Sequence, residues 1–242
     1  MAKDFMIEVI DVSKRFKVYE DRSYTLKDSI LNTRSKKYRY NEALKNINLS
    51  IVKGECVGLI GINGSGKSTL LKLITKILYP TSGSIKTYGK IASLLELGAG
   101  FNDDFTGLEN IYINGAIFGL KKKDIDKIVN NIIDFSELGD AIYSPVRTYS
   151  SGMYMRLAFS VAIHVNADIL MIDEILAVGD SSFKEKCYRK IEEIKKSGVT
   201  IVIVSHEMDV IKKFCDRGIV LTDHQVSFDG DINSAIHYYN NN

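Results

Sequence analysis

The sequence predicts an α/β fold with a mainly parallel central sheet, an antiparallel β part near the N-terminus and an inserted helical subdomain. Residues 56–60, 169–172 and 200–204 are short apolar runs, as expected for strands buried on both faces of a sheet. Helical patterns separate these runs, and strands that alternate with helices favour parallel pairing. Residues 6–11 and 44–51 instead alternate with period two, as strands with one buried face do.

Length and composition indicate an ordinary globular protein. The 242 residues suit one large α/β domain, so residues 1–242 are treated as a single domain. The net charge of +2 gives no overall field that would favour nucleic acid, and we expect none as a partner. The scattered cysteines, Cys56, Cys187 and Cys215, form no CxxC pair, so we expect reduced thiols rather than disulfides or a metal site.

Two segments depart from the strand–helix alternation. Residues 20–43 are polar and basic, and we expect a surface insertion there, in which Leu26, Ile30 and Thr33 have the spacing of a short helix. Residues 107–165 are predicted to form the helical subdomain. Thr106 and Glu109, at the start of this subdomain, have the spacing of a capping box.

A glycine-rich stretch after residues 56–60 fits the P-loop pattern GxxxxGK[ST], with a buried strand before it and a helix after it. Glycines let such a loop curl until its backbone N–H groups point at phosphate oxygens, and the helix start adds its positive dipole end. Lys67 is expected to reach the β- and γ-phosphates, and the Ser68 hydroxyl to ligate Mg²⁺. A glycine-rich turn without a ligand is the alternative, which this context disfavours. The predicted phosphate-binding residues are Gly61, Asn63, Gly64, Ser65, Gly66, Lys67, Ser68 and Thr69.

Two carboxylates, Asp173 and Glu174, follow the apolar run 169–172. They fall at the C-terminal end of a strand, where α/β sheets hold their ligands. Asp173 suits Mg²⁺ coordination through water, and Glu174 suits general-base activation of the attacking water. Adjacent acids at a strand end can also be simply solvated, a reading that the neighbouring P-loop makes less favourable.

The segment Tyr-Ser-Ser-Gly-Met at residues 149–153 resembles the LSGGQ signature of the ABC ATPase family. Ser150 matches the signature serine and Gly152 its second glycine, whereas Ser151 and Met153 depart from the pattern. This resemblance implies a P-loop NTPase fold, ATP and Mg²⁺ as cofactors, and a homodimer that closes head to tail around two nucleotides. An N-cap serine without a ligand is the alternative reading of Ser150.

The same resemblance implies roles for residues outside these motifs. His206, at the end of the run 200–204, would contact the γ-phosphate, and Asp180 would contact the partner subunit. Glu96 stands where the family usually has a glutamine, and it could ligate Mg²⁺ or orient water. An aromatic near the N-terminus should stack on adenine. We favour Tyr19 for that role, with Phe16 and Tyr40 as other candidates.

Three features resemble the ATP-binding subunits of bacterial exporters for lipid-linked polysaccharide, which serve O-antigen, teichoic acid and capsule export. They are the signature segment, the stretch Leu-Leu-Glu-Leu-Gly-Ala-Gly-Phe at residues 94–101, and the basic insertion. By this resemblance the 94–101 loop and the insertion would face the membrane subunit. Some members carry a further C-terminal carbohydrate-binding domain. Because the chain ends at Asn242, we expect none here.

The implied protein is the ATP-hydrolysing subunit of an exporter at the cytoplasmic face of the bacterial membrane. Its partners would be an integral-membrane permease and the lipid-linked polysaccharide. The sequence contains no apolar run of the roughly 20 residues that a spanning helix needs. Two alternatives stay open, namely an ABC ATPase for lipid or drug export and a soluble ABC ATPase that acts on ribosomes or DNA.

Overall fold

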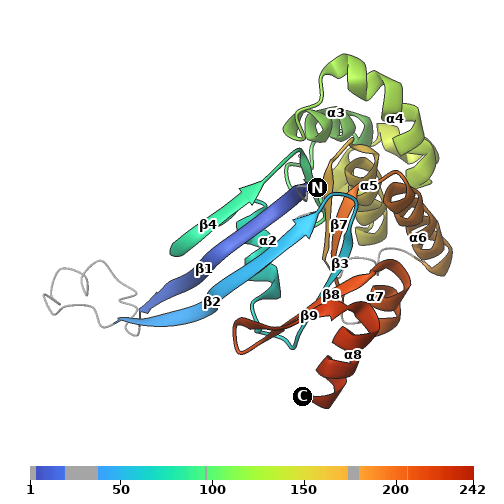
Figure 1. Cartoon of the computed structure of the whole chain (residues 1–242). Helices are drawn as coiled ribbons and strands as arrows, with labels where there is room; N and C mark the ends of the chain where they lie inside the picture. The colour runs from blue at the N-terminus through green and yellow to red at the C-terminus, as the bar shows by residue number, and fades with distance from the viewer. Residues whose placement is uncertain (1–3, 20–37, 96, 174–179, 206) are drawn as a thin grey trace, which may run out of the picture.

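The structure is a computed structural model that describes residues 4–19, 38–95, 97–173, 180–205 and 207–242. Two sheets stand beside a block of helices (Figure 1). The strands are β1 (Phe5–Tyr19), β2 (Tyr38–Val52), β3 (Cys56–Ile60), β4 (Ser82–Thr87), β5 (Ile91–Ser93), β6 (Ile169–Asp173), β7 (Thr200–Val204), β8 (Arg217–Thr222) and β9 (Gln225–Asp231). The α-helices are α2 (Lys67–Ile74), α3 (Gly107–Ile117), α4 (Lys122–Ser136), α5 (Ser151–His164), α6 (Ser181–Lys196), α7 (Met208–Phe214) and α8 (Ile232–Asn241).

The larger sheet has the strand order β5-β6-β7-β3-β8-β9. Its first five strands pair in parallel, and only β9 pairs antiparallel, with β8. The mainly parallel sheet that the sequence predicts is therefore confirmed. The C-terminal ends of β3 and β6 lead to the phosphate loop and to Asp173, and β7 alone lies between these two strands.

Both faces of strands β3, β6 and β7 are buried, which explains their continuous apolar runs. In β3, Val57 and Leu59 join a cluster that also contains α2 and the smaller sheet. Cys56 and Ile60 join a second cluster, under α5 to α8. Burial raises the pKa of the Cys187 thiol to about 12, so this cysteine serves as an apolar filler. All three cysteines are buried as free thiols, as expected.

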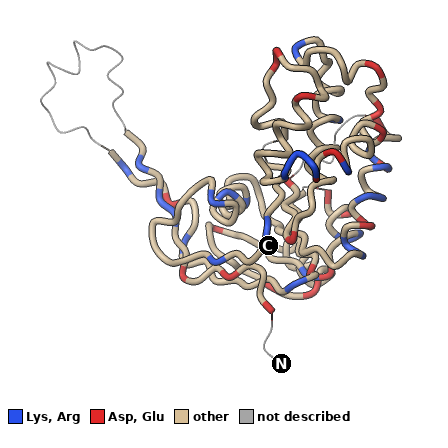
Figure 2. The backbone as a smooth tube through the Cα atoms, turned by 90° about the horizontal axis from the view of Figure 1, so that it is seen from above, with Lys and Arg blue, Asp and Glu red and all other residues tan. Residues whose placement is uncertain are grey.

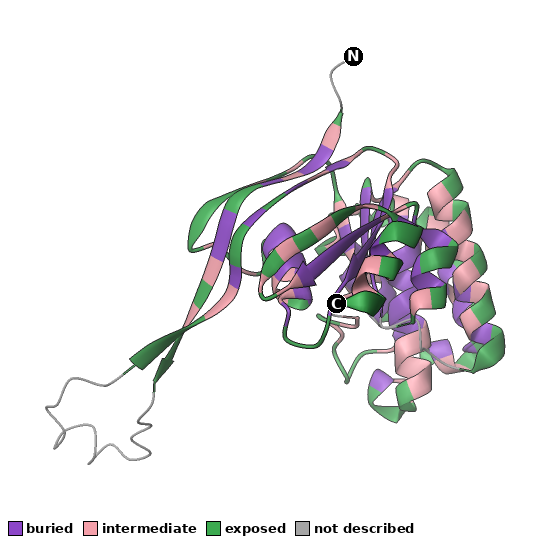
Figure 3. Cartoon of the chain, turned by 60° about the horizontal axis from the view of Figure 1, so that its bottom comes forward, coloured by how far each residue is buried: buried purple, intermediate pink, exposed green. Residues whose placement is uncertain are grey.

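The smaller sheet is antiparallel, in the order β2-β1-β4, and it confirms the antiparallel N-terminal part. Strand β2 begins at Tyr38, so residues 38–43, which we expected in the insertion, form strand because they pair with the end of β1. The paired residues 15–19 and 38–42 extend away from the body, and we call them the arm (Figure 3). Residues 20–37, with the helical spacing at Leu26, Ile30 and Thr33, lie outside the described residues.

The helices between residues 107 and 164 pack around a cluster of their own, centred on Ile111, Ile132 and Leu157. Helix α3 begins with the expected capping box, in which the Thr106 hydroxyl accepts a hydrogen bond from the Glu109 N–H. Helix α2 ends at Ile74, and Lys76 takes a left-handed conformation with φ of 62° that stops the helix.

Candidate nucleotide-binding site

The glycine-rich loop connects β3 to α2 and forms one wall of a cavity of about 400 Å³. The opposite wall comes from the smaller sheet and from the hairpin between β8 and β9. Residues of the glycine-rich loop and Asp173 line the same cavity, although more than a hundred residues separate them in the sequence. The lining residues are Phe16, Asn41, Ala43, Asn63, Gly64, Gly66, Lys67, Ser68, Thr69, Asp173 and His224.

Two glycines of the loop are required by its shape. Gly66 has φ of 108°, and a Cβ there would lie 2.5 Å from the Ala43 carbonyl oxygen. Gly64 has φ of 84°, and a Cβ there would meet nothing within 4 Å, so only its conformation favours glycine. The curl that these conformations produce leaves a cradle whose inner surface is backbone.

The Lys67 side chain is buried within this cradle, with 6% of its surface exposed. Its ammonium group donates hydrogen bonds to the carbonyl oxygens of Gly61, at 2.6 Å, and Ile62, at 2.9 Å. The side-chain oxygen of Ser65 is also buried and has no hydrogen-bond partner among the described residues. A buried ammonium and an unsatisfied hydroxyl in one loop fit an anionic ligand with several oxygen atoms.

Helix α2 begins in this cradle without a side-chain cap. Its N-cap residue, Gly66, makes no side-chain cap hydrogen bond, and its first turn contains no acidic residue. The first N–H groups of a helix need partners, and phosphate oxygens supply them. The donors at the start of α2 therefore fit a phosphate in the cavity.

The Ser68 hydroxyl and the Asp173 carboxylate line the same cavity. Mg²⁺ in nucleotide sites keeps several waters and takes one or two protein oxygens together with phosphate oxygens. A hydroxyl and a carboxylate on the wall of a phosphate cavity match that donor set. The residues present therefore fit a magnesium–nucleotide complex.

The structure distinguishes between the aromatic candidates for adenine. Phe16 lines the cavity, and its backbone pairs with Asn41, which lines it too. Tyr19 is not among the lining residues; its ring is 47% exposed and contacts Tyr38 edge-on, with centroids 6.2 Å apart. Tyr40 is 61% exposed and also contacts Tyr38. The geometry therefore favours Phe16 over Tyr19 and Tyr40, because only Phe16 reaches the cavity.

The signature segment lies at the start of α5, apart from this cavity. The Ser150 hydroxyl accepts a hydrogen bond from the Met153 N–H at 3.2 Å, and Ser150 is exposed. A Cβ at Gly152 would meet only the Ser150 side-chain oxygen, 3.9 Å away. Neither residue lines the nucleotide cavity within the described part of this single chain.

Asp180 begins helix α6. Its carboxylate accepts hydrogen bonds from the Phe183 N–H and the Ser182 hydroxyl, and these hold its pKa below the usual range. The same carboxylate pairs with Arg156 of α5 at 2.6 Å. Asp180 thus connects the start of α6 to the signature helix. The expected residues Glu96, Glu174 and His206 lie outside the described residues.

Sequence reasoning missed three residues of the cavity wall, Asn41, Ala43 and His224. Asn41 lies within the segment that we expected to be an insertion, so no strand register was available to place it opposite Phe16. His224 belongs to a two-residue hairpin loop, far from the glycine-rich loop in the sequence. The pairing of β3 with β8, together with the hydrogen bond from the Lys45 N–H of β2 to the His224 carbonyl oxygen, brings this hairpin to the nucleotide cavity.

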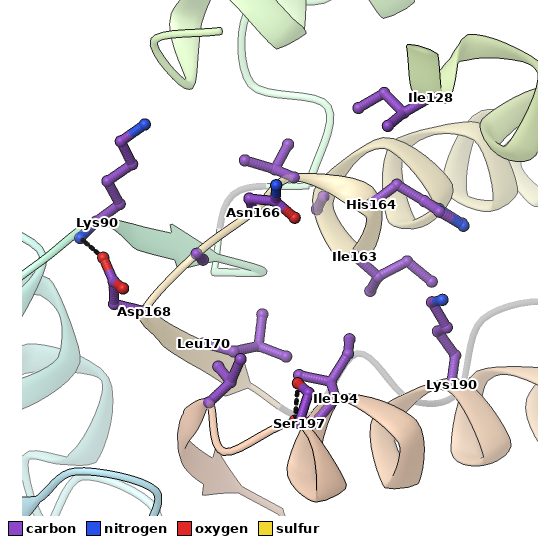
Figure 4. A pocket seen from close by; sticks show the side chains of 14 residues that line it. Lys90, Ile128, Ile163, His164, Asn166, Asp168, Leu170, Lys190, Ile194 and Ser197 are labelled. Carbon is purple, nitrogen blue, oxygen red and sulfur yellow. Dashed lines mark hydrogen bonds between the residues drawn. The ribbon is translucent and has the colours of Figure 1, made fainter. Parts of the chain in front are cut away.

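A larger cavity of about 580 Å³ lies elsewhere (Figure 4). Its wall includes Asp168, which directly precedes β6, whereas Asp173 stands at the other end of that strand. The Asp168 carboxylate is engaged by the Lys90 N–H at 2.7 Å, and His164 and Lys190 point into the space from two helices. This cavity is larger than the one beside the phosphate loop, but none of the phosphate-loop residues lines it, so it is not the candidate nucleotide site.

A glycine-rich loop between a buried parallel strand and an uncapped helix, with Asp173 at the end of a strand close by, defines a P-loop nucleotide-binding protein. Residues 44–177 match the family model described as "ABC transporter". The chain therefore belongs to the ABC transporter family, and it is an ABC ATPase.

Curated relatives of this chain are named as export ATP-binding proteins. The O-antigen export system ATP-binding protein RfbB of Klebsiella pneumoniae is 43% identical over 97% of both chains. The RfbB protein of Myxococcus xanthus is 59% identical over 72% of this chain and 40% of its own length. The teichoic acids export ATP-binding protein TagH of Bacillus anthracis is 42% identical over 98% of this chain and 42% of its own. The chain thus spans less than half the length of RfbB of Myxococcus xanthus and of TagH of Bacillus anthracis.

Solved structures show the same fold. An ATP-binding subunit of an ABC transporter superimposes with a TM-score of 0.77 at 21% identity, covering 97% of this chain and 93% of that one. A dimeric ATP-binding cassette in a post-hydrolysis state, bound to ADP and Pi, gives 0.74 at 24% identity, covering 94% and 99%. These likenesses confirm the fold class that the sequence predicts.

Proposed function

We propose that this chain is the ATP-hydrolysing subunit of an exporter that moves lipid-linked polysaccharide across the cytoplasmic membrane. The observation that carries this proposal is the similarity to O-antigen export RfbB of Klebsiella pneumoniae, which extends over 97% of both chains. TagH proteins, named for teichoic acid export, match at a comparable level, so the shared property is the export of a surface polymer.

The cavity supports a defined placement for MgATP. Phe16 stacks on the base, the loop from Gly61 to Thr69 surrounds the phosphates, and the Lys67 ammonium exchanges its loop carbonyls for β- and γ-phosphate oxygens. Ser68 and Asp173 hold Mg²⁺, which would neutralise charge on the phosphates. Glu174 accepts a proton from the attacking water, and His206 orients that water. Glu96 is the further candidate for a contact with the metal or with water.

Two copies closing head to tail complete each site in this proposal. Ser150 and Gly152 are absent from the cavity wall of their own chain, and Ser150 is exposed, so both are available to a nucleotide held by a second copy. The start of α5 adds a second set of N–H donors for the γ-phosphate. Asp180, at the start of α6, would contact the partner subunit near the same junction.

A permease subunit supplies the path through the membrane in this proposal. No helix within the described residues is both long and apolar enough to cross a membrane. Figure 2 marks in blue the positions of basic residues along the arm, which carries Arg15, Lys17 and Arg39. Cationic side chains are attracted to the anionic cytoplasmic surface of a membrane, so the arm supports a peripheral location there.

The test is to deplete the protein in its source cell and to analyse lipid-linked glycans inside the cell and on its surface. We expect polymer to accumulate inside and to disappear outside, and wild-type protein should restore export whereas the Lys67→Ala variant should not. Unchanged surface glycans without internal accumulation would overturn polysaccharide export. That result would favour lipid or drug export, or action on ribosomes or DNA.

A further inference from the structure

The arm has two faces, and only one of them belongs to the nucleotide site. Residues directly opposite each other in an antiparallel pair have their side chains on the same face, and successive residues alternate between the faces. Phe16 lies opposite Asn41, and both line the nucleotide cavity. The neighbouring pairs place a lysine and three tyrosines on the other face, which we call the outer face: Lys17, Tyr19, Tyr38 and Tyr40.

The outer face of the arm is aromatic, and its rings are open to solvent within the described chain. The exposed fractions are 47% for Tyr19, 47% for Tyr38 and 61% for Tyr40. The arm projects from the body of the protein, so the two sheets and the helices do not cover it (Figure 3). A cluster of exposed aromatic side chains marks a contact surface. The outer face therefore suits a partner outside this chain.

The rings of the outer face contact one another edge-on. The Tyr38 ring lies at 64° to that of Tyr19, with centroids 6.2 Å apart, and at 77° to that of Tyr40, with centroids 5.5 Å apart. The Lys17 ammonium covers one face of the Tyr38 ring, 3.7 Å from its centroid. Single-stranded nucleic acid is bound by successive bases that stack on open ring faces. This arrangement of tilted and covered rings disfavours such a partner.

The charge of the arm is positive, and it becomes more so toward the tip. The only acidic residue of the arm is Glu42, at its base, and the Glu42 carboxylate pairs with Arg15 at 2.9 Å. Beyond this pair, the charged residues of the arm are Lys17 and Arg39. Their two charges equal the formal net charge of the whole chain, which is +2. The excess positive charge of the protein is thus concentrated beside the exposed tyrosines.

We propose that the arm binds the anionic cytoplasmic surface of the membrane, with its tyrosines at the level of the lipid headgroups. This inference deepens the peripheral location in the proposed function, and it rests on that function for the presence of a membrane. Tyrosine concentrates at membrane interfaces because its ring is apolar and its hydroxyl is polar. Lysine and arginine are attracted to anionic headgroups. The arm combines both residue types on one projecting segment.

The experiment measures the binding of the full chain, without a permease, to vesicles of two compositions by cosedimentation. One vesicle contains phosphatidylcholine alone, and the other contains equal parts of phosphatidylcholine and phosphatidylglycerol. Wild-type protein should bind the anionic vesicles at least about 10-fold more tightly, since each cation near such a surface contributes. This preference should shrink as salt is added, because salt screens exposed charges.

Variants separate the contribution of the charge from that of the rings. Lys17→Gln should weaken binding to anionic vesicles about fivefold, the effect of one cation. Lys86→Gln is the matched control, because Lys86 is exposed on β4 of the same sheet but outside the arm, and it should bind as wild type does. The double variant Tyr38→Ala, Tyr40→Ala should bind both kinds of vesicle about 10-fold more weakly, since the burial of apolar ring area does not depend on lipid charge.

ATP binding in solution checks that these variants are folded. None of the substituted residues lines the nucleotide cavity, so each variant should bind ATP as wild type does. Wild-type protein that binds neither kind of vesicle, or equal losses in Lys17→Gln and Lys86→Gln, would overturn the membrane contact. Tighter binding of wild-type protein to single-stranded RNA than to anionic vesicles would also overturn it, in favour of nucleic acid.

The vesicle test and the glycan test can fail separately. Vesicle binding with the expected variant pattern, together with unchanged surface glycans after depletion, would keep the membrane contact and overturn polysaccharide export. Arrested export together with a chain that binds no vesicles would overturn the membrane contact and keep polysaccharide export.

Discussion

Helices α2 and α5 both begin at a site that the sequence assigns to phosphate, but their first turns are completed differently. Helix α2 follows Gly66, has no side-chain cap and opens into the nucleotide cavity. Helix α5 follows Ser150, whose hydroxyl already accepts the Met153 N–H. One helix start therefore has no side-chain cap and opens into a preformed cavity, and the other has a donor satisfied by its own chain.

This difference indicates how the two helix starts take part in binding. The start of α2 can hold a triphosphate within one chain, because its donors and the Lys67 ammonium already line one cavity. In the proposed dimer, the start of α5 would gain a ligand only when a second copy brings a nucleotide to the exposed Ser150. Changes near α2 should therefore impair binding by the single chain, whereas changes near α5 should impair only steps that need two chains.

The largest effect should follow from Glu174→Gln. If Glu174 is the general base, turnover should fall by about 10²- to 10⁴-fold while ATP binding is retained. Steady-state phosphate release and equilibrium nucleotide binding measure the two quantities separately. Near-normal turnover would remove Glu174 from the mechanism.

A comparable loss should follow from Lys67→Ala, but here it should include binding. Removing the ammonium would withdraw the charge that faces the β- and γ-phosphates in the proposed site, and we expect about 10²- to 10³-fold lower turnover together with weaker binding. Lys72→Ala, in the same helix but outside the cavity wall, is the control that should bind as wild type does. Equal effects of the two substitutions would show that Lys67 acts only through the stability of α2.

A smaller effect should distinguish the aromatic candidates. Phe16→Ala should weaken ATP binding about 10-fold, within the range of about 1–3 kcal/mol for one base stacked on an aromatic ring. Tyr19→Ala should leave binding unchanged, because Tyr19 contacts Tyr38 rather than the cavity. Calorimetric titration of both variants tests the assignment, and the reverse order of effects would restore Tyr19.

The smallest effect concerns the stability of the single chain. Ser150→Ala removes the cap of α5 and should lower the free energy of unfolding by about 1 kcal/mol. Nucleotide binding by the isolated chain should stay unchanged, since Ser150 does not line the cavity. Urea unfolding measures the first quantity and titration the second. Weaker ATP binding by this monomer would contradict the separation of the two helix starts.

The sequence predicts the phosphate loop well because each requirement is local. A glycine at φ of 108°, a lysine that folds back onto the loop and an uncapped helix start all lie within residues 61–69. The apolar runs in β3, β6 and β7 likewise report burial on both faces of the sheet. Capping at Thr106 and Ser150 is local too, and the structure contains both caps.

The remainder of the site depends on pairing between distant segments. Phe16 faces the cavity and Tyr19 does not because of the β1–β2 register, which composition alone does not specify. His224 reaches the cavity through the pairing of β8 with β3 and the contact of the hairpin with β2, so no motif could identify it. The strand pairing of residues 38–42 was not predicted for the same reason, since polar residues in a projecting strand pair carry no burial signal.

The most direct test of this account is nucleotide-dependent dimerisation, measured by sedimentation of the Glu174→Gln chain. We predict a monomer without nucleotide and a dimer with ATP. Adding Gly152→Asp should keep the chain monomeric, because the new carboxylate would repel the γ-phosphate of the nucleotide held by the second copy. The single chain has room for this substitution, since a Cβ at position 152 would meet only the Ser150 side-chain oxygen, at 3.9 Å. A chain that sediments identically with and without ATP, or a Gly152→Asp variant that still dimerises, would contradict the account.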